Sequence, residues 1–147
     1  MFQKSRRELS IADHMSAVAL PMVKDKKVFL TVLKHIKKSM YLMSRAYLLK
    51  QKKIRVIGVV PENEELCFQM FLEKFSSKFS IGSNEKHYLK ELEKVVDAYE
   101  NSQAEIKRGD NYVIFLPNFQ TVTVNSSNVK KYLSVASKIF TRVEDDI

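Results

Sequence analysis

The chain has little glycine, proline or cysteine: its 147 residues include three glycines, three prolines and one cysteine. Glycine and proline are the usual turn residues, and a fold of many short strands needs many turns. With so few of them, we expect a mainly α fold. The three glycines, Gly58, Gly82 and Gly109, also exclude a glycine-rich phosphate or dinucleotide loop, so no cofactor is expected. The single Cys67 excludes an internal disulfide and a thiolate metal site, and we interpret it as an inert core thiol in a reducing compartment.

Long apolar runs are also missing. The most apolar stretch, after Met40, is broken by Arg45 and Lys50, so no segment has the roughly 18 apolar residues of a membrane span. Near the N-terminus, Glu8 and Asp13 interrupt what would have to be the apolar region of a signal peptide. We therefore expect a soluble, cytoplasmic protein with no membrane span.

Hydrophobic periodicity predicts about five helices in a single domain, residues 1–147. The longest of them should be the spine of the fold. The predicted helices are Arg6 to about Leu20, ended by Pro21; Asp25 as N-cap to about Lys53; Asn63 to Gly82; Ser83 or Asn84 to Gly109, with Ile106 on its buried face; and a last helix capped by Asn125, Ser126 or Ser127.

Two stretches have the period of strands instead. Residues 54–60 are rich in β-branched side chains and end at Pro61, which predicts an extended connector or a short strand. Residues 112–116 and 119–124 are separated by Pro117-Asn118, a turn signal that predicts a β-hairpin at about 111–124. Because an isolated hairpin is marginal in water, it should pack on the helices or pair with residues 54–60.

The positive charge is concentrated in one segment. Eleven basic residues and one acid lie between Lys24 and Arg55, a charge of +10, while the rest of the chain has 14 basic and 16 acidic residues. At about 100° per residue, five of these cations share one side of the second helix. They are Lys27, Lys34, Lys38, Arg45 and Lys52, and we call them the stripe.

Like charges on one helix side do not help folding, so the stripe favours a polyanionic partner, RNA or DNA. Tyr41 lies beside it and would suit stacking on a base, or equally a helix–helix contact. A second interpretation pairs the stripe with acids of other helices, for which Glu91, Glu93, Asp97 and Glu100 are candidates. A third gives it an acidic protein as partner.

Apolar side chains surround the second helix. Leu30, Leu42, Leu48 and Leu49 lie off its main apolar face, so the helix is either central in the fold or meets a second subunit, and we expect a homodimer. The three histidines, His14, His35 and His87, lie on separate elements without metal-ligand spacing, and no metal site is expected.

Arg7 and His14, with six residues between them and Glu8 and Asp13 alongside, form the single catalytic-looking arrangement. The spacing resembles the Arg-x(4–6)-His motif of HEPN ribonucleases, small helical bundles in which the Arg stabilises phosphate charge and the His assists attack by the 2′-hydroxyl. In that family the motif lies late in the bundle, whereas here it is N-terminal. On one helix the two residues are also roughly 10 Å apart along the axis, so we expect no cleavage of RNA.

A second resemblance concerns the C-terminal half. Gly-Asp-Asn-Tyr-Val-Ile-Phe at 109–115 and Val-Lys-Lys-Tyr-Leu at 129–133 are similar to segments of small uncharacterised archaeal helical proteins that end in a hairpin and a helix. The resemblance implies a fold and no activity. The sequence thus predicts a non-enzymatic module that binds nucleic-acid phosphates through the stripe, with an oligomeric protein-interaction scaffold as the alternative and a HEPN-like ribonuclease as the third.

Overall fold

The computed structural model describes residues 2–18, 27–102, 104–109 and 111–147. Within these ranges the chain forms five helices and a small antiparallel sheet that precedes the last helix, so the predicted mainly α fold is confirmed. The elements are α1 (Phe2–Val18), α2 (Lys27–Lys53), α3 (Glu64–Phe75), α4 (Ser83–Glu100), β1 (Ala104–Arg108), β2 (Asn111–Phe115), β3 (Thr121–Val124) and α5 (Ser126–Asp146). The predicted cap Asp25 and the predicted stop at Leu20 and Pro21 lie outside the described residues.

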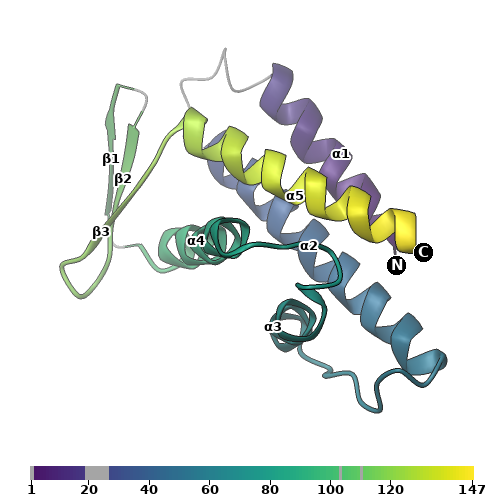
Figure 1. Ribbon diagram of the computed structural model, residues 1–147. Coiled ribbons are helices and arrows are strands. Elements are labelled where there is room, and N and C mark those ends of the chain that lie inside the picture. Colours follow the sequence, from purple (N-terminus) through teal and green to yellow (C-terminus); the bar gives the residue numbers. More distant parts are fainter. Residues whose placement is uncertain (1, 19–26, 103, 110) are drawn as a thin grey trace.

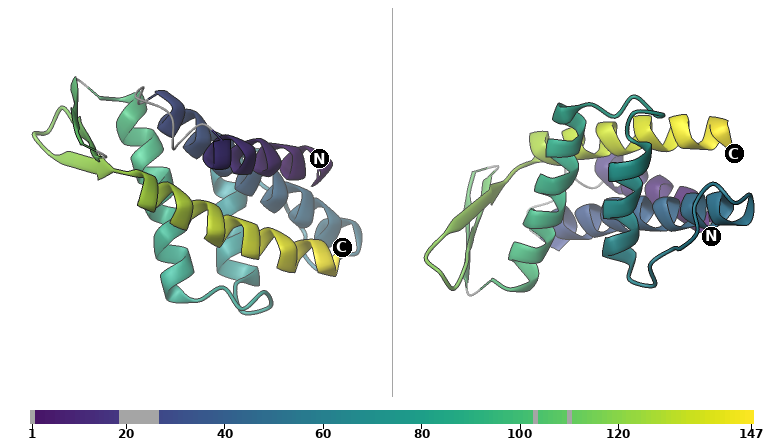
Figure 2. Two further views of the ribbon diagram at one scale, coloured as in Figure 1. Left: turned by 90° about the horizontal axis from the view of Figure 1, so that it is seen from above. Right: turned by 60° about the horizontal axis from the view of Figure 1, so that its bottom comes forward.

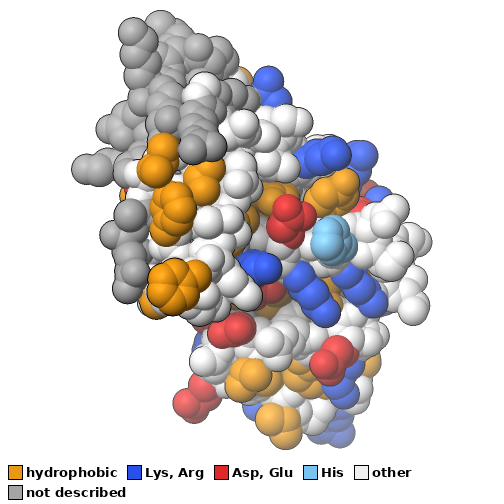
Figure 3. Space-filling model, turned by 90° about the vertical axis from the view of Figure 1, so that its left-hand side faces the viewer, with side chains coloured by type: hydrophobic (Ala, Val, Ile, Leu, Met, Phe, Trp, Pro, Cys, Tyr) orange, Lys and Arg blue, Asp and Glu red, His pale blue; other side chains and the backbone are white. Residues whose placement is uncertain are grey.

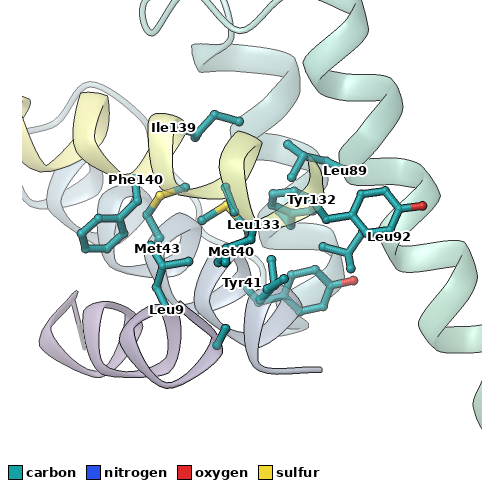
Figure 4. Packing of buried hydrophobic residues seen from close by; sticks show 14 of the residues in the cluster. Leu9, Met40, Tyr41, Met43, Leu89, Leu92, Tyr132, Leu133, Ile139 and Phe140 are labelled. Atoms are coloured by element: carbon teal, nitrogen blue, oxygen red, sulfur yellow. The ribbon is translucent and has the colours of Figure 1, made fainter. Parts of the chain in front are cut away.

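Three helices, α1, α2 and α5, lie side by side, while α3 and α4 cross α2 as a neighbouring pair (Figures 1 and 2). The sheet stands at one end of the molecule beside α4. Figure 4 shows Leu9 of α1, Met43 of α2 and Phe140 of α5 meeting in one apolar cluster. The core therefore follows α2, which the other four helices surround.

The sequence left open whether α2 is central in the fold or meets a second subunit, and the structure places it centrally. Leu30 is 8% exposed and Leu48 is fully buried, so both pack inside this chain. Leu42 is half-buried and Leu49 is 37% exposed. Leu30 and Leu48 are thus covered by neighbouring elements of the same chain, whereas Leu49 remains exposed. The expected homodimer stays a prediction.

Capping side chains fix where two of the helices begin. The side chain of Asn63 accepts a hydrogen bond from the backbone N–H of Leu66 at 3.1 Å, as the sequence predicts for the start of α3. Asn125 and Asn128 form a reciprocal capping box at the start of α5. At α4 the predicted cap is wrong by one or two residues, because Gly82 is the N-cap and Glu85 accepts from its backbone N–H.

The sheet has one strand more than the sequence predicted. The fourth helix ends at Glu100 instead of continuing to Gly109, and Ile106 lies in β1, paired with Val113 of β2. The predicted Gly109 stop acts instead as the turn between the two strands, with a φ of 60° that suits glycine. Pairing along β2 satisfies the backbone groups of residues 104–108, and this long-range gain is invisible to local periodicity.

Of the two alternatives that the sequence left open for residues 54–60, the structure shows the connector, without a strand. The sheet packs on α4, as one of the two alternatives for the hairpin predicted, and does not pair with residues 54–60. One further boundary differs from the sequence prediction. Helix α3 ends at Phe75, after which a turn still buries Phe79 in the core. No helix in the described ranges combines the length and the apolar character needed to cross a membrane.

Candidate nucleic-acid interface

Acids from neighbouring helices neutralise the first half of the predicted stripe. Lys34 Nζ lies 3.8 Å from Glu100 Oε1 of α4, and Lys38 Nζ lies 3.4 Å from Glu8 Oε1 of α1. Between them, Lys37 Nζ lies 3.4 Å from Asp97 Oδ1. These pairs are partly exposed and each is worth less than about 1 kcal/mol, so they moderate the stripe without removing its cations from solvent.

The second half of the stripe has fewer acidic neighbours. Arg45 donates a hydrogen bond to the backbone carbonyl of Glu62 at 2.9 Å, and Lys52 is exposed near the end of α2. The side chain of Lys27 lies outside the described residues. The structure thus shows, for the first half of the stripe, the pairing with acids of other helices that the sequence left as an alternative, because α1 and α4 bring Glu8 and Glu100 against Lys38 and Lys34.

Tyr41 is not a stacking surface. Its side chain is 8% exposed, its ring centroid lies 5.3 Å from that of Phe68, and its hydroxyl donates to Glu93 Oε2 at 2.5 Å. Burial raises the pKa of the Tyr41 hydroxyl, and the neighbouring Glu93 raises it further. Of the two roles that the sequence left open for Tyr41, the structure shows the helix–helix contact, because α3 and α4 cover its ring.

The acids of α4 are directed toward other elements or along the helix. Four of the five bind a group on α2 or α5, and Glu91 lies 3.6 Å from His87 of the same helix. The four pairs are Glu85 with Arg142 at 3.0 Å, Glu93 with Tyr41 at 2.5 Å, Asp97 with Lys37 at 3.4 Å and Glu100 with Lys34 at 3.8 Å. Three of these acids, Glu85, Asp97 and Glu100, are thus paired with cations of α2 or α5 and not with the lysines of α4.

Those lysines form an open row. Lys86, Lys90 and Lys94 recur every four residues, about 6 Å apart along α4. On the adjacent helix α5, Lys131 lies over the ring of Tyr88 at 5.4 Å, and Lys138 follows it by two turns on the same side. None of these five lysines, which we call the α4–α5 basic face, forms an ion pair with a carboxylate of the described ranges. The row of α4 and the Lys131 site lie on two sides of α4, with His87 and Glu91 between them.

Figure 3 shows Lys and Arg side chains on one side of this view, with acidic side chains and a histidine among them, and apolar side chains near the sheet on the other side. The α4–α5 basic face does not stand out when charge is counted by segment. In such a count the negative charges of α4 offset the positive charges of its lysines. The sequence does show that Lys86, Lys90 and Lys94 are spaced four residues apart. The groups of α2 and α5 that lie nearby decide how the acids of α4 are paired.

A groove of about 640 Å³ separates α3 from α4. Glu65 and Glu73 line its α3 wall. The row of Lys86, Lys90 and Lys94 lines its α4 wall together with Glu93 and Asp97. At one end it reaches Leu116, at the base of the turn between β2 and β3. The groove therefore connects the lysine row of α4 with the protruding hairpin.

Glu93 is the half-buried acid of this groove. Burial raises the pKa of its carboxyl, and the negative charges of Glu65 and Asp97 add to that increase, against the lowering effect of the Tyr41 hydrogen bond. A carboxyl whose pKa is raised in the folded state destabilises the fold once it ionises, so this cost grows as the pH rises through that pKa.

Replacing Glu93 with glutamine is therefore expected to stabilise the protein at pH 7 and to stabilise it less at pH 4. The glutamine carbonyl keeps an acceptor for the Tyr41 hydroxyl while removing the charge. Urea denaturation followed by circular dichroism at both pH values measures the difference. Glu73→Gln is the control, since Glu73 is an exposed acid on the other wall; equal effects of the two substitutions at both pH values would contradict the explanation.

The structure joins the acid beside Arg7 to another helix. Arg7 and His14 are both exposed on α1, whereas Glu8, next to Arg7, contacts His35 and Lys38 of α2. Within the described residues, no side-chain hydrogen bond or ion pair joins His14 to Arg7 or to Asp13. The expectation that this pair does not cleave RNA stays a prediction.

Cys67 and the histidines give no sign of a reactive or metal centre in the described ranges. Burial raises the pKa of the Cys67 thiol, which donates to the backbone carbonyl of Pro61 at 2.9 Å. A raised pKa is the opposite of what a nucleophilic cysteine requires. No group of three or more potential metal ligands occurs in the part of the chain that the structure describes.

Comparison of the chain with protein-family models, with curated proteins and with solved structures found no match. Any functional conclusion therefore rests on the geometry and charge of the surface.

Proposed function

We propose that this protein is a non-enzymatic module that binds the phosphates of nucleic acid, RNA or DNA, through the α4–α5 basic face. One observation carries the proposal: Lys86, Lys90 and Lys94 line one groove wall without an ion-pair partner among the described residues. The acids of α4 pair instead with groups of α2 and α5 or with His87. Lysines present point charges and no base code, so the expected binding tolerates many sequences. Arg45 and Lys52 of the stripe are the secondary contacts.

The supporting argument is electrostatic. Lysines held close together repel each other, and bound phosphate groups relieve that repulsion by neutralising their charge. Binding also releases the counterions that are condensed on the phosphate chain. The first half of the stripe gains less from phosphate, because Lys34 and Lys38 must first exchange their pairs with Glu100 and Glu8. The α4–α5 basic face requires no such exchange within the described residues.

The test compares two variants with equal loss of charge. Lys86, Lys90 and Lys94 are replaced by alanine in one variant, and Lys34, Lys38 and Lys52 in the other. With about 0.7–0.9 counterions released per phosphate contact, the α4 variant should bind labelled RNA and DNA about 100-fold more weakly at 0.1 M salt, and the α2 variant should lose less. Fluorescence anisotropy gives the dissociation constants, and circular dichroism confirms that both variants fold.

The opposite order of losses would assign the interface to the stripe of α2. Absence of binding by the unmodified protein, even at low salt, would overturn the proposal and favour a protein partner instead.

A specific surface supports that second candidate, an interaction scaffold. Ile54, Val56, Val59 and Leu66 are 58%, 58%, 71% and 51% exposed around the connector between α2 and α3. Lys52 and Lys53 adjoin them, which suits an acidic protein partner or a second copy of this chain. A homodimer would form through this patch, because its apolar side chains are more exposed than the leucines of α2.

A further inference from the structure

The turn between β2 and β3 holds an aromatic ring in solvent. Phe119 is 99% exposed and has a φ of 64°, in the left-handed region that bulky residues rarely adopt. Three hydrogen bonds fix the turn around it: Leu116 N–H to the Gln120 carbonyl at 2.9 Å, Phe119 N–H to the Leu116 carbonyl at 3.2 Å and Gln120 N–H to Asn118 Oδ1 at 3.2 Å. The ring is thus presented to solvent by an ordered turn.

The outer side of the sheet continues this apolar surface. Ile106 of β1 is 44% exposed and pairs with Val113 of β2, which is half-buried, so both point to the same side of the sheet. Phe115, two residues after Val113, is half-buried on that side as well. The opposite side, with Tyr112 and Ile114, is buried. Apolar groups are therefore left uncovered on the side of the sheet that faces away from the core.

The lysine row leads to this hairpin. Leu116 lines the same groove as Lys86, Lys90 and Lys94, and Phe119 follows Leu116 by three residues, a reach of at most about 10 Å. A chain that contacts the lysines through negative groups can thus extend to the ring of Phe119. Positive charge at regular spacing within reach of an exposed aromatic ring is the combination that proteins use to bind single-stranded nucleic acid.

We propose that the nucleic acid recognised by this protein is single-stranded, with a base stacked on Phe119 and its phosphates on the lysine row of α4. This inference rests on the proposed function and adds the substrate class to it. In a duplex each base is stacked between its neighbours, so its face is not available to an aromatic side chain, whereas an unpaired base exposes both faces. Stacking on a phenyl ring tolerates every base, in keeping with point-charge contacts from lysines.

The first experiment measures binding of a labelled single strand and of a duplex of equal length at 0.1 M salt. Phe119→Ala should weaken binding of the single strand by roughly 5- to 150-fold, the usual range for one lost base–aromatic contact, and leave duplex binding unchanged. Phe119→Tyr keeps a stacking ring and should bind as the unmodified protein does. Val59→Ala, at the exposed connector between α2 and α3, is the matched control and should change neither affinity.

The second experiment reads the stacking directly. Because the chain contains no tryptophan, Phe119→Trp introduces one reporter. A saturating single strand should change its fluorescence, whereas inorganic polyphosphate, which has no bases, should bind without that change. Unchanged fluorescence with the bound single strand, or equal single-strand affinity of Phe119→Ala and the unmodified protein, would overturn the inference.

The two proposals fail in different ways. If polyphosphate and duplex binding depend on Lys86, Lys90 and Lys94 while Phe119 has no effect on any ligand, the single-strand inference is wrong and the proposed function stands. If no polyanion binds, both are wrong. A response of Phe119→Trp to anionic lipid vesicles with none to the oligonucleotide would overturn the inference in favour of a membrane surface.

Discussion

Replacing Phe71 with alanine is expected to lower the free energy of unfolding by about 3–5 kcal/mol. Phe71 of α3 is fully buried, and its ring centroid lies 5.8 Å from that of Tyr47, 5.9 Å from that of Phe79 and 6.3 Å from that of Phe75. The substitution removes this shared aromatic packing and leaves a cavity where α3 meets α2. Since a domain of this size has about 5–15 kcal/mol in total, the variant should be close to unfolding.

Urea denaturation followed by circular dichroism measures the effect, with Phe119→Ala as the matched control. Both changes delete one phenyl ring, but Phe119 is 99% exposed and its loss should change the free energy of unfolding by less than about 0.5 kcal/mol. A small effect of Phe71→Ala would show that α3 does not pack on α2 as described.

Affinity for single-stranded nucleic acid is expected to fall about 100-fold between 50 and 200 mM salt. If the five lysines of the α4–α5 basic face each neutralise one phosphate, the logarithm of the binding constant falls with the logarithm of salt concentration at a slope of about −3.5. A duplex contacted by the same five lysines would give about −4.5. Anisotropy titrations at four or five salt concentrations provide the slope.

The variant without Lys86, Lys90 and Lys94 should show a slope smaller in magnitude by about 2 with the single strand. A slope close to zero for the unmodified protein would mean that phosphate contacts do not drive binding. Loss of affinity with no change in slope would mean that these lysines act through folding and not through phosphate.

Local patterns in the sequence were sufficient for most of the fold. The apolar period along residues 27–53, the cap at Asn63 and the capping residues before α5 each act within a few residues of chain, so they identify α2, α3 and α5. The Pro117-Asn118 turn predicted the β2–β3 hairpin for the same reason. The strand β1 was missed because its partner lies across a turn and its own residues also fit the helical period.

For the charged surface, the sequence predicted the amount of charge but not which charges are paired. Sequence alone determined that α2 carries a large excess of positive charge and that glycine-rich phosphate loops are absent. Only the tertiary structure decided which cations remain unpaired, because Glu8 reaches Lys38 from α1 and Glu100 reaches Lys34 from α4. Asp97 and Glu85 likewise pair with Lys37 and Arg142 and not with the lysines of α4. Ion pairs between helices depend on which helices are neighbours and on the side that each presents, and neither is encoded in the charge count of a single segment.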